Sequence, residues 1–309
     1  MATQGFSPRT RADAQLVRFG AAAARVAVRG ERGAVPVEAT VVVQRAGGKE
    51  AHLNGARVDR VEQLRSDLAT LVFTPDRLSV VKGGPAVRRA YFDRALGRLL
   101  PAQAALPAAY GEALGQRNAS LRRIVLGLSS REALEPWTAR LAELGAELVA
   151  VRQRVLDLLA PGFRERAGEL GLAVAGLEYR GEPPTVESLA ARLDRDLERG
   201  STGLGPHLDE IAIVAGTREL RSFGSQGEQR LAVLSLLLAE ADLIAETRPS
   251  PPLLLLDDVL SELDGERRVT LTNRLPAGGQ TVVTAVDDRA LPGEPAQVVL
   301  VEPGKARTR

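Results

Sequence analysis

The sequence lacks several features that other classes of protein depend on. It has no cysteine, so it can form neither a disulfide framework nor a metal site built on thiolates. Lysine occurs only at Lys49, Lys82 and Lys305, and none of them completes the pattern Gly-x-x-x-x-Gly-Lys-Ser/Thr. In that pattern a glycine-rich backbone cradles phosphates while the lysine reaches the β- and γ-phosphate oxygens. These 309 residues therefore contain no Walker A phosphate-binding loop.

Features of membrane proteins are also missing. The longest apolar stretch, residues 231–245, is interrupted by Ser235, Glu240 and Asp242, and no signal-peptide pattern opens the sequence. A hydrophobic content of 44% in 309 residues suits one large domain or two ordinary ones with a sizeable core. We therefore predict a cytoplasmic protein that makes no membrane contact.

Net charge says little about this chain, whereas the distribution of charge is informative. The excess of 41 Lys and Arg over 39 Asp and Glu is small, and a pI near 9.3 results because few groups titrate near neutral pH. Residues 1–100 hold 17 basic and 9 acidic side chains, whereas residues 201–309 hold 11 and 16. The amino-terminal third is thus the basic part, and we predict that it faces phosphates.

An apolar run that ends in two acids is the most specific motif. Four leucines at 253–256 are followed by Asp257 and Asp258, and Asp264 comes six residues later. Such a run suits a central parallel strand covered on both faces. At its carboxyl end, Asp257 would hold Mg²⁺ through water and Asp258 would polarise an attacking water, as in a Walker B strand. A buried strand followed by an acidic helix cap gives the same pattern, and the motif alone does not separate the two.

A second motif precedes this strand by about thirty residues. Ser225, Gln226 and Gly227 lead into the apolar helical run 231–240. A Ser-x-Gly turn at a helix start offers free backbone N–H groups, a hydroxyl and the positive end of the helix dipole to a γ-phosphate. Alone, the segment would more often be a plain helix cap. One helix before a Walker B strand, it indicates the signature loop of an ABC-type ATPase head.

The residues of these two motifs resemble those of one family. Ser-Gln-Gly-Glu-Gln-Arg at 225–230 and Leu-Leu-Leu-Asp-Asp-Val-Leu-Ser-Glu-Leu-Asp at 254–264 resemble RecF, a bacterial recombination mediator related to SMC and Rad50 heads. Residues 73–93, 110–118 and 205–210 are similar to three further family segments, and the resemblance runs from about Arg9 to Asp287. It implies an α/β fold, an ABC-ATPase (SMC/Rad50-like) head with an inserted α-helical arm.

The resemblance also implies a site shared by two heads. In the family, nucleotide lies between the Walker motifs of one head and the signature loop of the other. Ser225, Gln226 and Gly227 would cap the γ-phosphate in trans, and Gln229 belongs to the same loop. The expected cofactors are ATP and Mg²⁺, and the expected assembly is an ATP-dependent homodimer.

On the Walker B side, the family pattern assigns Asp257 and Asp258 to catalysis, with Asp257 as the metal ligand. It places Asp264 near the composite interface and His207 near the phosphate site. Leu208 stands where the family motif has arginine, so this position lacks a side chain for contact with phosphate or DNA. Because aspartate reaches the attacking water less well than the usual glutamate, slow hydrolysis is expected.

The expected biology is that of the family, with two alternatives. RecF-like proteins bind single-stranded and gapped or linear duplex DNA, act in replication, recombinational repair and the SOS response to DNA damage, and work with RecO and RecR mediators. The second hypothesis is a nucleotide-free remnant that binds DNA or protein through its basic third and its arm. A transporter ATPase is a third, weaker one, because such domains lack a long helical insertion and carry Glu after Walker B.

The missing Walker A bears on where the chain starts. Residues 7–10 are similar to the family segment that follows the phosphate loop, so we expect the sequence to begin after that unit. A misplaced start and a natural truncation are both compatible with this expectation. Without the loop, several charge-assisted bonds worth about 1.5–3 kcal/mol each are lost, so the chain should bind ATP in cis poorly.

Three divisions are predicted along the chain. Residues 1–92 form the amino-terminal part of the head, 93–198 the helical arm and its return, and 199–309 the carboxy-terminal part of the head. An antiparallel meander is expected over residues 24–53 and paired helices within 86–168. Turns are expected at Gly127 and at residues 161–162, and a loose basic tail from Pro303 onward.

Overall fold

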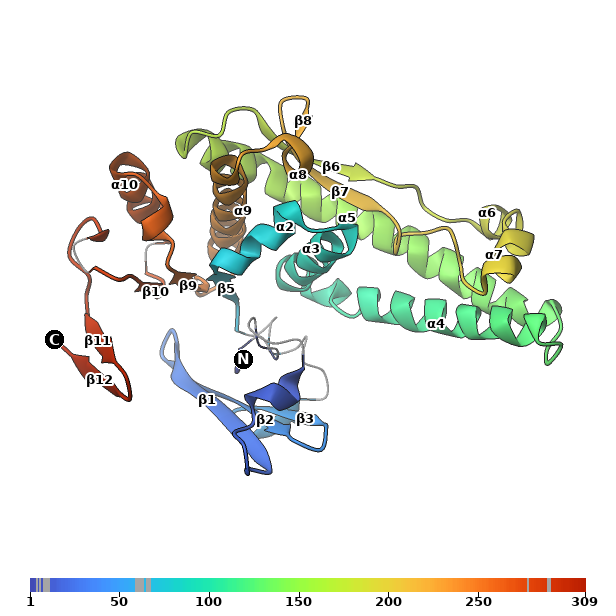
Figure 1. Ribbon diagram of the computed structural model, residues 1–309, viewed down its shortest axis with the longest axis horizontal. Helices are drawn as coiled ribbons and strands as arrows, with labels where there is room; N and C mark the ends of the chain where they lie inside the picture. The colour runs from blue at the N-terminus through green and yellow to red at the C-terminus, as the bar shows by residue number, and fades with distance from the viewer. Residues whose placement is uncertain are drawn as a thin grey trace.

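Two long helices form the frame of the molecule. The computed structural model describes residues 1–3, 5, 7, 12–58, 64, 68–276, 278–287 and 290–309. Helix α5 (Glu135–Glu169) runs the length of the helical body, and α9 (Gln226–Thr247) packs across it (Figure 1). Residues 8–10, within the segment predicted to follow a phosphate loop, lie outside the described residues.

The turn predicted at residues 161–162 is wrong, because Pro161 lies inside α5. Leu159 and Phe163 on either side of it are fully buried, and this packing keeps the segment helical although proline removes one backbone hydrogen bond. Gly162 has a role in the crossing of the two helices. A Cβ at this position would lie 3.3 Å from the Cβ of Ala239 in α9, so glycine allows a close approach.

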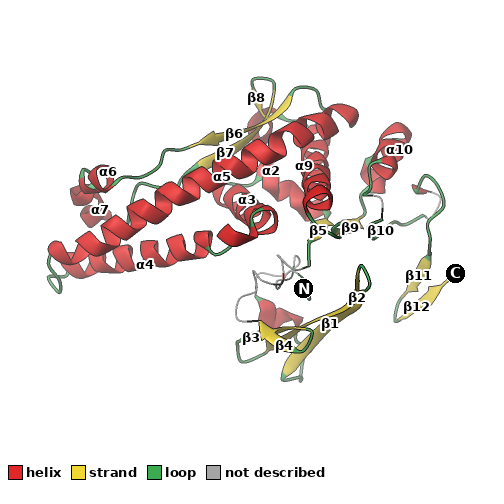
Figure 2. Cartoon of the chain, turned by 180° about the vertical axis from the view of Figure 1, so that it is seen from behind, coloured by secondary structure: helices red, strands yellow, loops and turns green. Residues whose placement is uncertain are grey.

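The predicted pairing of arm helices is confirmed, with one difference. The amino-terminal member of the predicted pair is divided into two helices, α3 (Pro85–Leu99) and α4 (Leu106–Val125), because Pro101 starts a short 3-10 turn between them. Helix α4 lies alongside α5 (Figures 1 and 2). Gly127 adopts a left-handed conformation in the turn that follows α4, as predicted.

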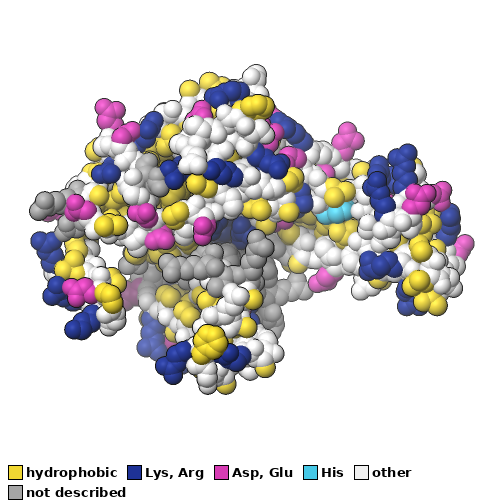
Figure 3. Space-filling view, viewed as in Figure 1, with side chains coloured by type: hydrophobic (Ala, Val, Ile, Leu, Met, Phe, Trp, Pro, Cys, Tyr) yellow, Lys and Arg dark blue, Asp and Glu magenta, His cyan; other side chains and the backbone are white. Residues whose placement is uncertain are grey.

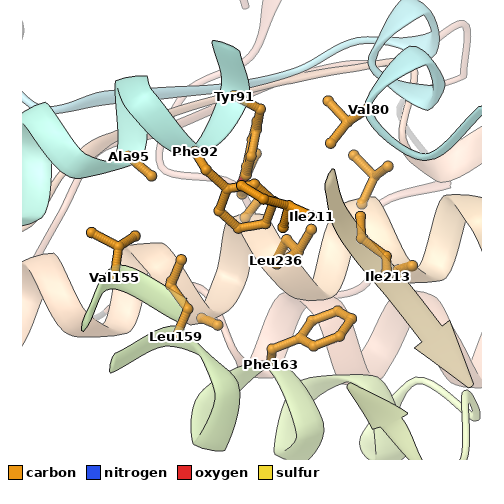
Figure 4. Packing of buried hydrophobic residues seen from close by; sticks show 14 of the residues in the cluster. Val80, Tyr91, Phe92, Ala95, Val155, Leu159, Phe163, Ile211, Ile213 and Leu236 are labelled. Carbon is orange, nitrogen blue, oxygen red and sulfur yellow. The ribbon is translucent and has the colours of Figure 1, made fainter. Parts of the chain in front are cut away.

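A continuous hydrophobic core, the main core, joins these helices to the sheets behind them. Figure 4 shows Phe92 of α3, Phe163 of α5 and Leu236 of α9 packed around Ile211 and Ile213 of strand β7. All five side chains are buried. The arm and the head therefore share one core through the bases of α3 and α5.

Two small sheets flank α9. One is parallel in the order β10–β9–β5, and the other is antiparallel in the order β6–β7–β8. The strands of the first are β5 (Thr70–Phe73), β9 (Leu253–Asp257) and β10 (Thr281–Thr284). The strands of the second are β6 (Ala175–Arg180), β7 (Glu210–Ala215) and β8 (Arg218–Glu219).

The amino-terminal lobe is a separate antiparallel sheet, as predicted. Its strands are β1 (Ala23–Arg32), β2 (Val35–Gln44), β3 (Lys49–Leu53) and β4 (Ala56–Val58). The buried side chains of the lobe form a core of their own, which includes Val17, Val41 and Leu64. Strand β1 is mostly exposed.

The carboxyl end is a hairpin, so the prediction of a loose tail is wrong. Strand β11 (Val299–Glu302) pairs with β12 (Lys305–Thr308). Pro303 and Gly304 form the two-residue turn, with Gly304 in the left-handed conformation that such a turn requires. The Pro-Gly pair was the sequence signal for this hairpin.

Short helices complete the fold. The α-helices are α2 (Ser79–Lys82), α6 (Val186–Ala190), α7 (Leu193–Arg199), α8 (Leu220–Phe223) and α10 (Gly265–Asn273). The 3-10 helices are η1 (Asp13–Leu16), η2 (Pro75–Leu78), η3 (Pro101–Gln103), η4 (Glu132–Leu134) and η5 (Leu260–Glu262).

Two sequence predictions concern the limits of these elements. The predicted boundary at 92/93 falls within α3, and that at 198/199 falls at the end of α7; the three divisions stay predictions. Within the ranges that the structure describes, no helix combines the length and the apolar content needed to span a bilayer.

Candidate nucleotide-binding site

The acid pair, Asp257 and Asp258, lies at the carboxyl end of strand β9. Leu254 and Leu256 are buried on one face of this strand, and the alternate leucines are half-buried. Strand β9 is parallel to both of its neighbours, so the three carboxyl ends meet at one edge of the sheet. That edge is where open parallel sheets place their ligands.

One hydroxyl joins the two acids. Thr284, the last residue of β10, is paired in register with Asp257. Its hydroxyl donates to Asp257 Oδ1 at 2.6 Å and accepts from the backbone N–H of Asp258 at 3.0 Å. Asp258 has a φ of 52°, a left-handed conformation that aspartate tolerates better than most residues. The chain thus turns immediately after the strand, and Thr284 fixes that turn.

The charge of the acid pair is not neutralised by the described part of the chain. Neither Asp257 nor Asp258 forms an ion pair with a described Lys or Arg, and both are half-buried. Among the described residues no group of three acids or histidines could hold a metal alone. Two carboxylates beside a hydroxyl fit Mg²⁺, which keeps several waters and takes other ligands from phosphates. The donor set therefore fits the predicted ion.

Asp264 has a structural task. It is the N-cap of α10, where Oδ1 accepts from the Arg267 backbone N–H at 2.9 Å and Oδ2 pairs with the Arg267 guanidinium at 2.8 Å. The same guanidinium donates to the carbonyl of Leu170 after α5. Asp264 thereby ties the segment after the acid pair to the helical body.

The signature loop, residues 224–230, forms the start of α9. Ser225 is the N-cap, and its hydroxyl accepts from the Glu228 backbone N–H at 3.2 Å. The Glu228 carboxylate accepts from the Ser225 backbone N–H at 2.7 Å, and this bond together with Arg218 lowers the pKa of Glu228. Gln226 and Gly227 are exposed. The plain helix cap is therefore present, and it leaves the serine O–H proton available to a ligand.

Gln229 supports this loop from behind. Its side chain is buried, and Nε2 donates to the carbonyl oxygens of Leu220 at 2.8 Å and Gly224 at 3.2 Å. Its Oε1 is buried and has no hydrogen-bond partner among the described residues. The amide fixes the entry into α9 instead of lying on the surface with Gln226.

His207 lies beside α4 and is hydrogen-bonded through both ring nitrogens. Nε2 is 3.1 Å from the carbonyl oxygen of Thr202, which can only accept, so Nε2 carries the proton and Nδ1 accepts from the Tyr110 hydroxyl at 2.7 Å. Burial lowers the pKa of His207. Arg152 donates to the adjacent Pro206 carbonyl. The loop around His207 is thus bound to α4 and α5.

The predicted residues fall into three separate places. Asp257 and Asp258 share one sheet edge, and Asp264 follows on the next helix. Ser225 lies with Gln226, Gly227 and Gln229 at the start of α9 beside α8, whereas β5 and β9 lie at the other end of α9 (Figures 1 and 2). His207 is bound to Tyr110 of α4. The structure does not join these groups within one chain.

Two functional contacts were not predicted from the sequence. The capping role of Glu228 follows from the Ser-x-x-Glu spacing, which is a helix-start signal. The bond from Thr284 to Asp257 depends on the register of two parallel strands. That register is a long-range property that the local sequence does not specify.

Comparison with known proteins identifies relatives over most of the chain. It is 36% identical over 307 residues to the DNA replication and repair protein RecF of Myxococcus xanthus, covering 93% of this chain and 79% of that protein. It is 35% identical over 284 residues to RecF of Heliobacterium modesticaldum, covering 88% and 76%. No family model matches the chain.

Solved structures agree with these relatives. The recombination mediator protein RecF with ATP has a TM-score of 0.87 at 25% identity, covering all of this chain and 86% of the other. An SMC head bound to a winged-helix domain has a TM-score of 0.50 at 16% identity, which supports the fold alone. These likenesses confirm the predicted α/β ABC-ATPase head with an inserted helical arm. The chain belongs to the RecF family.

Proposed function

We propose that this chain acts in DNA replication and recombinational repair as an ATP-switched, DNA-binding dimer of the RecF kind. The observation that carries the proposal is the separation of two half-sites, a half-buried acid pair and an exposed helix start. The acid pair with Thr284 is suited to Mg²⁺ and the start of α9 to a phosphate, yet they lie at different ends of α9. A nucleotide can contact both only if two copies face each other.

Within such a dimer, each residue has a distinct task. Asp257 would hold Mg²⁺, which neutralises charge on the β- and γ-phosphates, and Asp258 would orient the attacking water. Ser225 and Gly227 of the other copy would donate to the γ-phosphate through the hydroxyl and backbone N–H groups. Thr284 positions Asp257 by its hydrogen bond.

Partners follow from the same reasoning. The basic amino-terminal lobe is the proposed DNA surface, with single-stranded, gapped and linear duplex DNA as ligands. RecO- and RecR-type mediators are the proposed protein partners, because a solved RecF structure with this fold is described within the RecFOR pathway. We place this activity in the cytoplasm.

Nucleotide affinity tests the proposal first. Because the 309 residues contain no Walker A loop, they should bind MgATP weakly when assayed alone by calorimetry. A chimaera that joins the Walker A unit of Myxococcus xanthus RecF to residue 1 should bind MgATP and dimerise with it in analytical ultracentrifugation. Tight MgATP binding by the 309 residues alone would contradict this account of the site.

A mixing experiment then tests whether the site is shared. In the chimaera, Ser225→Arg and Asp257→Asn should each abolish ATP-dependent dimerisation. A one-to-one mixture of the two variants should recover part of it, since one composite site in the mixed dimer is intact. No recovery would show that both residues act on nucleotide within the same copy, contrary to the proposal.

A further inference from the structure

Phe19 is exposed, whereas most of the few aromatic side chains that the structure describes are at least partly buried. Of the phenylalanines that the structure describes, Phe73, Phe92 and Phe163 belong to the main core. Phe19 is 94% exposed and Phe223 is 69% exposed. Phe223 lies next to the signature loop and so within the proposed dimer interface. Phe19 lies in the amino-terminal lobe, away from that site, although burial of a phenylalanine is strongly favourable.

The turn that carries Phe19 is well defined. Phe19 and Gly20 are the two central residues of a tight turn in which the Ala21 N–H donates to the Arg18 carbonyl at 3.0 Å. Gly20 has a φ of 80°, the left-handed value that a type II turn requires at this place. The turn therefore places Phe19 at its outer corner.

Arg45 holds the turn and the ring together. Its guanidinium donates to the carbonyl oxygens of Ala21 at 2.9 Å and Val17 at 3.1 Å, and also to that of Arg18. The same group lies 5.6 Å from the centroid of the Phe19 ring, within the range of a cation–π contact. The ring is thus held on a braced turn with a cation beside it, and nearly all of its surface remains open to a ligand.

The surroundings of this ring are basic. Residues 12–58 contain seven Lys and Arg against four Asp and Glu. Figure 3 shows Lys and Arg side chains around the lobe that carries β1–β3. Arg18, next to Phe19, is exposed and makes no side-chain interaction within the described part of the chain. An anionic ligand with a flat aromatic part fits this arrangement.

We propose that Phe19 and Arg45 form a stacking site for an unpaired nucleobase, with Arg18 contacting a neighbouring phosphate. The inference rests on the proposed DNA-binding function and assigns it a contact. Bases stack on aromatic side chains whatever their sequence, and the guanidinium favours the adjoining phosphate backbone. A base inside a duplex is already stacked on both faces. The site therefore selects single-stranded stretches and junctions over continuous duplex.

Anisotropy titrations of the full chain with a single-stranded oligonucleotide and a blunt duplex test this site. Phe19→Ala should weaken single-strand binding by about tenfold and leave duplex binding unchanged. Phe19→Trp should retain binding because it keeps a stacking face, and Phe19→Leu should behave as Phe19→Ala. Val35→Ala, an exposed apolar change at the other end of the β1–β2 hairpin, is the matched control and should have no effect.

Salt dependence separates the two contacts. Arg18→Ala should lower the slope of log affinity against log salt by about one, because it removes one phosphate contact. Phe19→Ala should lower affinity without changing that slope. A single-stranded oligonucleotide containing 5-iodouracil should, under near-ultraviolet light, crosslink to the peptide that carries Phe19.

Each failure has a distinct meaning. If the wild-type chain binds single-stranded DNA and Phe19→Ala binds equally well, the stacking site is disproved and the proposed function stands. If the wild-type chain binds neither DNA, the proposed function fails for this chain and the stacking site with it. If Phe19→Ala instead reduces binding to another protein copy, in ultracentrifugation, while DNA binding is unchanged, the exposed ring is a protein contact and the inference is wrong.

Discussion

Carboxylates have a basic partner in the helical body but none among the described residues at the sheet edge. In the body, Asp196 is 1% exposed, and it pairs with Arg117 at 2.8 Å and accepts from the Gly203 N–H at 2.9 Å. At the sheet edge, Asp257 and Asp258 are half-buried, adjacent, and without a basic partner among the described residues. The same functional group is neutralised in one place and left available in the other.

The contrast distinguishes structural from functional acids. A buried carboxylate is tolerated only when a cation and hydrogen bonds compensate its desolvation, and the body supplies both. Asp257 and Asp258 have a threonine hydroxyl and backbone contacts but no basic partner among the described residues, so this compensation is missing at the sheet edge. A metal ion would supply the missing positive charge, so the sheet edge suits ion binding better than stability.

The largest expected effect comes from the buried Asp196–Arg117 pair in the helical body. Asp196→Ala leaves the Arg117 guanidinium buried and unpaired, which should lower the free energy of unfolding by about 3–5 kcal/mol. Asp194, two residues earlier, is 81% exposed at the side chain and pairs with the exposed Arg131. Asp194→Ala should cost less than about 1 kcal/mol. Urea denaturation measures both, and equal losses would remove the distinction between the two regions.

Loss of the helix cap should have an intermediate effect. Ser225→Ala removes the acceptor for the Glu228 N–H, and such caps are worth about 1 kcal/mol. Ser225→Asp keeps an acceptor and should retain most of the stability. If Ser225→Ala is as stable as the wild type in the same denaturation assay, the capping box contributes nothing to α9.

The acid pair should contribute little to stability. Asp258→Asn removes one of two adjacent charges, so the free energy of unfolding should change by less than about 0.5 kcal/mol or rise slightly. Asp196→Asn is the matched change in the body and should be clearly destabilising. A large loss from Asp258→Asn would mean that the sheet edge, like the body, uses its acids for structure.

The smallest expected effect is a pH dependence that originates at His207. Burial lowers its pKa in the folded state below the ordinary value of 6.5, so the unfolded chain binds a proton first as pH falls. The contribution of His207 to the free energy of unfolding is complete above pH 6.5. It decreases as pH falls from 6.5 to the lower pKa of the folded state. His207→Gln should show a weaker decrease over that window, measured as unfolding free energy against pH. An identical slope in both proteins would exclude His207 as its source.

Local sequence was sufficient for the motifs but not for their spatial relation. The strand that ends at Asp257 was predicted from a run of four leucines, and the helix start at Ser225 from a Ser-x-Gly turn before an apolar helical run. The bond from Thr284 to Asp257 was not predictable, because it depends on the register of strands 27 residues apart in the chain. The buried position of Gln229 was likewise hidden, as it is set by the packing of the preceding turn.

Both wrong predictions of secondary structure concern Pro-Gly pairs, which usually interrupt helices and strands. Pro161 and Gly162 predict a turn, yet they lie in the middle of α5, where packing against α9 favours the helix. In the tail, Pro303 and Gly304 do form a turn, and it closes a hairpin in place of the predicted loose end. The same residue pair thus ends regular structure only where no neighbouring element packs on it.

The unbroken course of α5 has a mechanical consequence. About 27 residues separate its contact with α9 at Gly162 from its outer end at Glu135, a distance of about 40 Å at 1.5 Å per residue. A rotation of about 5° at that crossing displaces the outer end by about 3.5 Å, by the geometry of a rigid rod of this length. Helix α5 is therefore a lever that converts a small tilt at its crossing with Ala239 of α9 into a displacement as large as a hydrogen-bond length.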